Sequence, residues 1–185
     1  MTKFYTRTGD DGTTGILGEG RVMKFDLRME ALGALDELSA AMGLMRSALP
    51  DVRHQSEIVS LQRKLYELMA EVAASPENAA KFHKIDNDSI AEIEQLIDEY
   101  STNLVVPQGF IIAGDTPASA TSDLARAIAR RAERRVAELL DRGDVGNKNL
   151  LGYLNRLSSF LFVLEIKLIQ EAGKEQPLPA RDETK

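Results

Sequence analysis

A basic run between Arg126 and Arg135 is the segment whose residue types and spacing first suggest chemistry. At about 100° per residue of an α-helix, several of its charged side chains fall within about a third of the circumference. They are Arg126, Arg130, Glu133 and Arg134, whereas Arg131 and Arg135 point elsewhere. Arginines that share a face repel one another unless an anion lies among them, and a triphosphate would supply that anion. A solvated helix face with intrahelical ion pairs is the alternative interpretation.

A glycine- and threonine-rich segment, Tyr5–Gly15, is a second candidate for binding an anion. It holds three glycines and four threonines, so backbone N–H groups and hydroxyls can converge on a phosphate. Arg7 and Lys24 would bring positive charge to the same place. The segment lacks the Gly-Lys-Ser/Thr of a Walker A loop and the strand–turn–helix context of a dinucleotide fingerprint. A floppy N-terminal arm is the alternative.

Two polar residues on predicted helices, Asp36 and Asn155, are further candidates. Asp36 lies on or near an apolar stripe, where a buried carboxylate needs a partner that Arg126 or Arg130 could supply across the bundle. Asn155 lies beside apolar positions of the last helix and would face a polar pocket between helices. The alternatives are a surface acid at a helix edge for Asp36 and a purely structural hydrogen bond for Asn155.

Composition excludes several other chemistries. The chain has 185 residues, a formal charge of −6 and no cysteine, which rules out disulfides, thiolate nucleophiles and cysteine-ligated metals. His54 and His83 have no glutamate three residues before them, so a di-iron bundle is excluded, and both are expected to be exposed or in loops. The acidic balance argues against nucleic acid as a partner. No apolar run reaches the ~18 residues of a membrane span, so we expect a cytoplasmic protein without membrane contact.

The elements that must position the candidate residues are helices. Apolar residues recur every three or four positions over 32–45, 58–72 and 90–104, as in helices that pack against one another. Two more helices are predicted, from about Pro117 to Asp141 and from about Asn147 to Ala172. The turn-rich residues 105–117 are expected to form a connecting loop with one extended stretch.

This pattern predicts an all-α fold: a five-helix bundle with ferritin-like up-and-down packing and a Gly-rich N-terminal loop. We expect a single domain over residues 1–173, made of the loop at 1–24 and the bundle at 25–173. Residues 174–185 are polar and hold two prolines, so a disordered tail is expected there.

Several motifs, in this order, resemble the PduO-type ATP:cob(I)alamin adenosyltransferases. The first, Thr6–Thr14, is similar to the N-terminal ATP-binding signature of that family, and Lys24 and the segment Glu30–Leu38 follow it. The others are Arg130–Arg135 and Tyr153–Ser158. The resemblance covers nearly the whole chain.

The resemblance implies a homotrimer with the active site between neighbouring subunits. It implies transfer of the 5′-deoxyadenosyl group of ATP to the cobalt of cob(I)alamin, which forms adenosylcobalamin and releases triphosphate. Magnesium would be carried with the ATP phosphates, and its protein ligands stay unassigned. Direct transfer of the product to a cobalamin-dependent enzyme is also implied. A non-catalytic carrier or sensor of ATP or adenosylcobalamin is the alternative, and a purely structural bundle is another.

The resemblance also implies roles for individual residues. Those implied to bind ATP are Thr6, Arg7, Thr8, Gly9, Asp10, Gly12, Thr14, Gly15, Lys24, Arg130, Glu133, Arg134 and Asn155. Those implied to be catalytic are Arg130, Arg126, Asp36 and Phe110. Phe110 would keep water and the dimethylbenzimidazole tail from the lower face of the corrin, and Asp36 would pair with Arg126.

Two positions depart from the family's usual pattern. Phe110 leads into Ala113-Gly114-Asp115, where relatives usually have a Pro-Gly-Gly run. Asp123 stands where many relatives have a histidine. Both positions are expected beside the corrin, so they bear on corrinoid affinity or preference more than on ATP binding.

Overall fold

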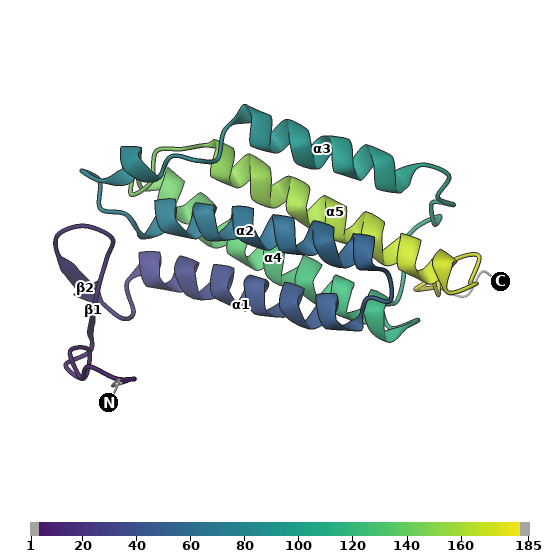
Figure 1. Ribbon diagram of the computed structural model, residues 1–185, viewed down its shortest axis with the longest axis horizontal. Coiled ribbons are helices and arrows are strands. Elements are labelled where there is room, and N and C mark those ends of the chain that lie inside the picture. Colours follow the sequence, from purple (N-terminus) through teal and green to yellow (C-terminus); the bar gives the residue numbers. More distant parts are fainter. Residues whose placement is uncertain (1–3, 182–185) are drawn as a thin grey trace.

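The computed structural model describes residues 4–181, and over these residues it consists of five α-helices and one small hairpin (Figure 1). The hairpin pairs β1 (Thr13–Gly15) antiparallel with β2 (Arg21–Met23). The helices are α1 (Leu27–Ala48), α2 (Val52–Ala73), α3 (Asn87–Ser101), α4 (Pro117–Asp141) and α5 (Asn149–Glu171). A short 3-10 helix, Ala79–Phe82, lies between α2 and α3.

Successive helices run in opposite directions, so the predicted all-α bundle is confirmed (Figure 1). Helix α4 packs against both α1 and α5, α2 packs on α1, and α3 packs on α5. The predicted apolar stripes line the core between these helices. Fully buried members of the stripes include Leu35, Leu38, Met42, Ile58, Leu65, Leu68, Leu157, Leu161 and Leu164. Each such side chain contributes roughly 1.5–3 kcal/mol by leaving water.

Side-chain caps fix where helices begin. Asp86 and Ser89 bond each other's backbone N–H groups at the start of α3, which identifies Asp86 as the cap of that helix. Thr116 and Ser119 form the same reciprocal box at the start of α4, with Pro117 in the first turn. The start of α4 is therefore a well-defined anchor for the segment that precedes it.

The predicted loop at residues 1–24 contains the hairpin, which sequence patterning missed. Its connection docks on the end of α2: the Leu17 N–H donates to the Ala73 carbonyl at 2.8 Å, and the Ser75 N–H donates to the Leu17 carbonyl at 2.9 Å. Gly18 follows with φ 131°, and a Cβ there would lie 2.5 Å from Nδ2 of Asn78. The positive φ and the close approach together favour glycine at this position.

The tail differs from the expected disorder. Over residues 174–181 it lies beside the segment before α4, and Ile111 and Pro179 form an antiparallel bridge. This bridge supplies the extended stretch expected within residues 105–117. Proline is compatible with a strand that pairs on one side only, because it lacks an N–H. Residues 182–185 lie outside the described residues.

The two histidines occupy different environments. His83 follows the 3-10 helix and its side chain is half exposed, as expected. His54 was expected to be exposed or in a loop, but it is buried on α2. Its ring nitrogens lie 2.9 Å from the Tyr100 hydroxyl and 3.0 Å from the Glu171 carboxylate, which satisfy both polar atoms.

No helix within residues 4–181 is long and apolar enough to span a membrane.

Candidate active site

The N-terminal loop is built from hydrogen bonds between near neighbours. The Thr6 and Thr8 hydroxyls lie 2.8 Å apart, and the Gly12 N–H donates to the Gly9 carbonyl at 3.2 Å. The Lys24 N–H donates to the Gly12 carbonyl at 2.9 Å, which ties the loop to the chain after β2. These bonds bring one end of the hairpin next to the predicted anion-binding residues.

Lys24 lies directly over the loop. A Cβ on Gly9 would be 3.2 Å from Nζ of Lys24, so the ammonium group approaches where the glycine has no side chain. Arg7 has a left-handed backbone with φ 64°, and its guanidinium lies 5.4 Å from the centre of the Tyr5 ring. The structure thus joins Lys24 to the glycines as predicted, while Arg7 is turned toward an exposed aromatic ring.

Two residues of this loop were missed as structural supports. Arg21 donates from Nη2 to the Thr8 carbonyl at 2.6 Å and from Nε to the Thr13 hydroxyl at 2.8 Å. The backbone N–H and hydroxyl of Thr13 both donate to Asp11, and they hold the pKa of that carboxyl below its usual value. The Asp-x-Thr spacing of an Asx turn was the available signal for Asp11.

A cavity of about 660 Å³ lies between α4, α5 and the segment before α4. Three of the predicted catalytic residues, Phe110, Arg126 and Arg130, line it together. Phe162 and Val163 of α5 add apolar wall, and Phe110 itself is 90 % exposed. The cavity therefore combines an apolar surface with two guanidinium groups, as a large amphipathic ligand requires.

Asp36 does not pair with Arg126 within this chain. Asp36 is exposed on α1, while Arg126 pairs with Asp123 of its own helix at 2.6 Å. The Arg126 guanidinium also lies 5.9 Å from the centre of the Phe162 ring. A carboxylate one helical turn away is the nearest partner available to Arg126. Sequence reasoning noted Asp123 as a departure but not as the partner of this arginine.

The rest of the basic face behaves as the helical projection predicted. Arg131 points away and pairs with Glu37 of α1. Arg130 and Arg134 are exposed and have no recorded acidic partner among residues 4–181. Two guanidinium groups are therefore left for an external anion.

Asn155 connects this face to α5. Its Nδ2 donates to Glu133 at 2.9 Å, and its carbonyl oxygen accepts from Arg156 at 2.8 Å. Asn155 and Glu133 are half-buried neighbours, and their bond joins the two helices, which fits both the predicted polar pocket and the alternative of a structural hydrogen bond.

Glu165 is the residue behind the cavity that sequence reasoning missed. Its side chain is fully buried, and neither carboxylate oxygen has a hydrogen-bond partner. Burial raises the pKa of Glu165 to about 7, with Asp123 adding to the rise and Arg126 opposing it. A single acid within the apolar run Phe160–Ile166 was the available signal.

The two regions do not meet within one chain. No hydrogen bond or ion pair recorded for residues 4–181 joins the N-terminal loop to α4 or α5. Figure 1 shows the hairpin projecting beyond the end of the bundle.

Within residues 4–181, no three histidine, aspartate or glutamate side chains gather as a metal site.

Solved structures with this arrangement define the class of protein. A PduO-type ATP:corrinoid adenosyltransferase from Lactobacillus reuteri, a phenylalanine-to-alanine variant complexed with cobalamin and ATP, superposes with a TM-score of 0.86 at 27% identity. That match covers 97% of this chain and 100% of the other. An arginine-to-lysine variant complexed with ATP gives a TM-score of 0.87 at 27% identity, covering 96% and 100% of the two chains.

The family model for cobalamin adenosyltransferase matches residues 4–168. The chain therefore belongs to the cobalamin adenosyltransferase family.

Curated relatives agree. The chain is 38% identical over 162 residues to the corrinoid adenosyltransferase PduO of Salmonella typhimurium, covering 87% of this chain and 48% of that protein. It is 35% identical over 167 residues to the corrinoid adenosyltransferase of Bacillus subtilis, covering 86% and 83%. The chain thus spans about half the length of the first relative and most of the second.

Proposed function

We propose that this protein transfers the 5′-deoxyadenosyl group of ATP to the cobalt of cob(I)alamin. The electron pair of Co(I) forms the Co–C5′ bond, the C5′–O bond breaks, and triphosphate leaves with that bonding pair. The observation that carries the proposal is the cavity in which Phe110, Arg126 and Arg130 converge, within a chain that belongs to the cobalamin adenosyltransferase family.

The chain's contribution is to hold ATP and to stabilise the leaving triphosphate, because Co(I) is itself the nucleophile. The residues proposed to bind ATP are Thr6, Arg7, Thr8, Gly9, Asp10, Gly12, Thr14, Gly15, Lys24, Arg130, Glu133, Arg134 and Asn155. Lys24 over Gly9 supports phosphate binding at the loop. The unpaired Arg130 and Arg134 among residues 4–181 support stabilisation of the charge that develops on triphosphate.

The apolar part of the cavity is proposed to receive the corrin. Phe110 would cover the lower face of the cobalt, where exclusion of water and of the dimethylbenzimidazole tail favours Co(I). Arg126 would orient the corrin with Asp36, and the exposure of Asp36 on α1 fits a pairing formed across a subunit boundary. The Asp123–Arg126 ion pair would then exchange partners when the assembly forms.

A homotrimer with active sites between subunits is proposed as the working form. The separation of the N-terminal loop from the arginine face within one chain supports it, since a neighbouring subunit can supply the missing half. Sedimentation of the purified protein tests the assembly, and a monomer that keeps full activity would contradict it.

Four further features remain proposals. Residues 1–173 would form a single adenosyltransferase domain, and the family match over residues 4–168 supports that extent. Magnesium would enter with the ATP phosphates. The protein would work in the cytoplasm, which cell fractionation tests. It would pass its product directly to a cobalamin-dependent enzyme, which co-purification of the two proteins tests.

The decisive experiment is an anaerobic mixture of protein, MgATP and chemically reduced cob(I)alamin, followed by visible absorbance. We expect protein-dependent loss of the Co(I) spectrum, a light-sensitive alkylcobalamin and one free triphosphate per product. ATP binding without this reaction would instead identify a non-catalytic carrier or sensor.

A further inference from the structure

The segment that carries Phe110 is bounded by two unusual backbone positions. Gly109 and Gly114 have φ values of 95° and 116°, a region that residues with a Cβ rarely adopt. Phe110 and Ala113 between them are exposed, although both line the cavity. The segment needs a support outside itself, because exposed loops without packing open readily.

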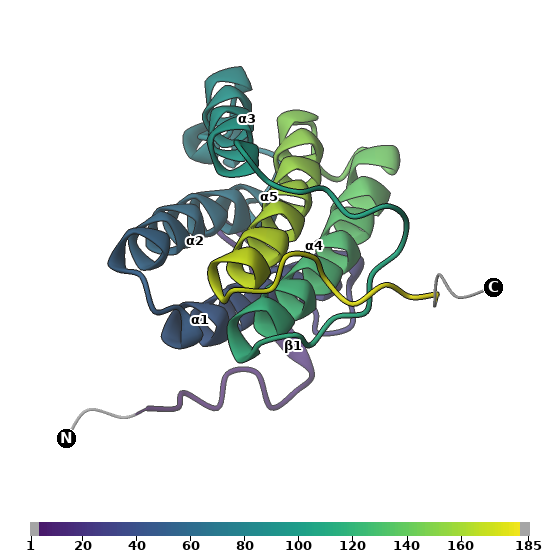
Figure 2. The same cartoon turned by 90° about the vertical axis from the view of Figure 1, so that its right-hand side faces the viewer.

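The C-terminal segment supplies that support. After α5 the chain turns back at Gly173 and runs beside the Phe110 segment (Figure 2). The Ile112 N–H donates to the Leu178 carbonyl at 2.8 Å, and the Ala180 N–H donates to the Phe110 carbonyl at 2.8 Å. Within residues 4–181, residues 110–113 form these two backbone hydrogen bonds, and both go to the C-terminal segment.

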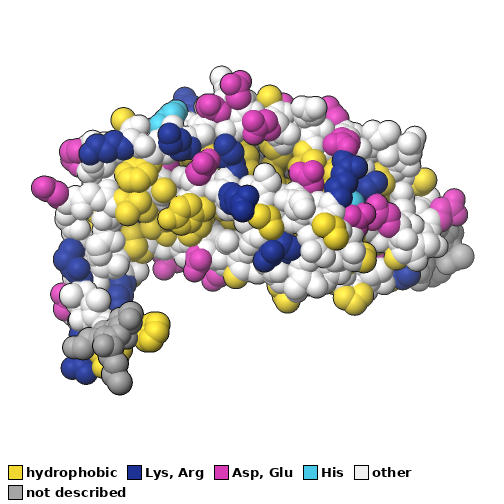
Figure 3. All heavy atoms as spheres, in the orientation of Figure 1, with side chains coloured by type: hydrophobic (Ala, Val, Ile, Leu, Met, Phe, Trp, Pro, Cys, Tyr) yellow, Lys and Arg dark blue, Asp and Glu magenta, His cyan; other side chains and the backbone are white. Residues whose placement is uncertain are grey.

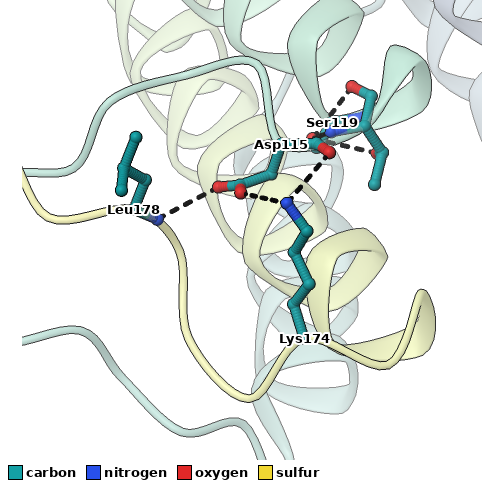
Figure 4. A network of polar contacts seen from close by, with 5 residues as sticks. Asp115, Ser119, Lys174 and Leu178 are labelled. Carbon is teal, nitrogen blue, oxygen red and sulfur yellow. Dashed lines mark hydrogen bonds and ion pairs between the residues drawn. The ribbon is translucent and has the colours of Figure 1, made fainter.

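Asp115 fastens the two segments to each other (Figure 4). One carboxylate oxygen accepts from Nζ of Lys174 at 2.6 Å, and the other accepts from the Leu178 N–H at 3.1 Å. Nζ of Lys174 also donates to the Asp115 carbonyl at 3.3 Å. The Asp115 side chain is 9% exposed, whereas the Lys174 side chain reaches it from the surface and is 49% exposed.

Asp115 is also fixed to the bundle. It immediately precedes Thr116, whose reciprocal bonds with Ser119 cap α4. Lys174 follows the end of α5, so the ion pair joins the start of one cavity helix to the end of the other. Loss of this ion pair should therefore alter the position of Phe110 but not the distant N-terminal loop.

We propose that Asp115 and Lys174 are positioning residues that hold Phe110 at the cavity by fastening the C-terminal segment to residues 109–115. The inference rests on the proposed role of Phe110 in cobalamin binding. It also explains the departure at Ala113-Gly114-Asp115, where relatives usually have a Pro-Gly-Gly run. In this chain the Asp115 carboxylate anchors the C-terminal segment.

Hydrogen exchange and steady-state kinetics of two variants test the proposal. Asp115→Asn and Lys174→Met each remove the charge pair, and we expect roughly tenfold faster exchange of the Ile112 and Ala180 amides without substrates. We expect roughly a fivefold higher KM for cob(I)alamin with an unchanged KM for ATP, because only the cavity side loses its support. Lys174→Arg keeps the charge and should restore both values.

Asp144→Asn is the matched control, because Asp144 pairs with Arg142 near the other end of α4 at 3.1 Å. It should change neither exchange at Ile112 nor either KM. Unchanged exchange in Asp115→Asn would overturn the fastening. Faster exchange with an unchanged KM for cob(I)alamin would overturn the positioning role.

These outcomes are separable from failure of the proposed function. Exchange is measured on the free protein and does not depend on turnover. If the wild type bound cobalamin without turning over, equilibrium dialysis with cob(II)alamin would replace KM. The same roughly fivefold loss of affinity would be expected in Asp115→Asn, and its absence would overturn the proposal.

Discussion

The N-terminal loop and the cavity between α4 and α5 differ in how far apart in the sequence their parts lie. The loop closes through bonds among residues 6–24, none of which spans more than thirteen positions. The cavity joins residues 109–113, 123–130 and 158–163, and the C-terminal segment supports it from outside. One region is a local motif at the edge of the bundle, and the other depends on the whole bundle.

This difference has energetic consequences. Side chains of the loop are mostly exposed, so their substitution changes ligand binding with little effect on folding. The cavity is backed by the fully buried Glu165, so its chemistry and the stability of the bundle are connected. Variants of the two regions should therefore separate into those that alter binding alone and those that alter both.

The largest effect is expected at Arg130, where the cavity side must stabilise the leaving triphosphate. Arg130→Ala should lower kcat by about 10²–10³, the typical loss when one group that stabilises developing charge is removed. Single-turnover absorbance of the Co(I) form measures it. Arg131→Ala is the control, since Arg131 pairs with Glu37 on another face and should keep near-normal turnover. Near-normal turnover of Arg130→Ala itself would remove Arg130 from the proposed mechanism.

The second effect is a pH dependence of stability. It arises from Glu165, the buried residue behind the cavity, and not from the exposed loop. Burial raises the pKa of Glu165 to about 7. Between the ordinary pKa of glutamate and about pH 7, the folded chain therefore keeps a proton on Glu165 that the unfolded chain has lost. The contribution of Glu165 to stability is full below about pH 4.5 and falls by about 3 kcal/mol as pH rises to about 7. After burial, the nearby charges act on this pKa: Asp123 and Asp115 raise it further, and Arg126 lowers it.

Urea unfolding of wild type and Glu165→Gln, at pH 5, 6, 7 and 8 and equal protomer concentration, measures this slope. We expect the variant to lose the decline between pH 5 and 7, because glutamine does not titrate. Asp11, Asp86 and Asp115 have lowered pKa values and act at lower pH, whereas burial raises the pKa of Glu71 in both proteins alike, so the difference between the two slopes isolates Glu165. Equal slopes in the two proteins would show that Glu165 is ionised in the fold.

The same contrast explains what could be predicted from sequence. The bundle followed from helical periodicity, and Pro117 marked the start of α4, because those signals are local. The N-terminal loop was singled out as a contiguous motif, although its hairpin depends on docking to Ala73 and Ser75, more than fifty residues away.

Several contacts that sequence reasoning missed join residues far apart in the sequence, while others lie within one helical turn. The Asp115–Lys174 pair joins residues 59 positions apart, and neither residue has a motif of its own. Arg126 was expected to pair with Asp36, but the single chain gives it Asp123. His54 was expected to be exposed or in a loop, but it is buried and bonds Tyr100 and Glu171, which lie far from it in the sequence. Periodicity assigns a residue to a face but does not say which side chain it will meet.

Lys24 tests the loop side of the comparison. Lys24→Ala should raise the KM for ATP roughly thirtyfold, since it removes a charge-assisted phosphate contact, and should leave the KM for cob(I)alamin unchanged. Initial rates with each substrate varied in turn measure the split. Lys64→Ala is the control, because Lys64 pairs with Glu67 of its own helix α2 at 3.2 Å, outside both regions. A parallel rise in both KM values would mean that Lys24 supports the fold of the site and not the phosphates.

Phe110 tests the cavity side, with a smaller effect because its side chain is exposed in the free chain. Phe110→Ala should lower kcat/KM for cob(I)alamin roughly tenfold, as expected for loss of one large apolar contact at a ligand, with ATP affinity retained. Val106→Ala is the control, because Val106 is an exposed apolar residue of the same connecting segment and does not line the cavity. If Phe110→Ala weakened ATP and cob(I)alamin equally, the phenylalanine would be acting on the bundle as a whole. A selective loss would instead place cobalamin at the cavity, the region assembled from distant segments.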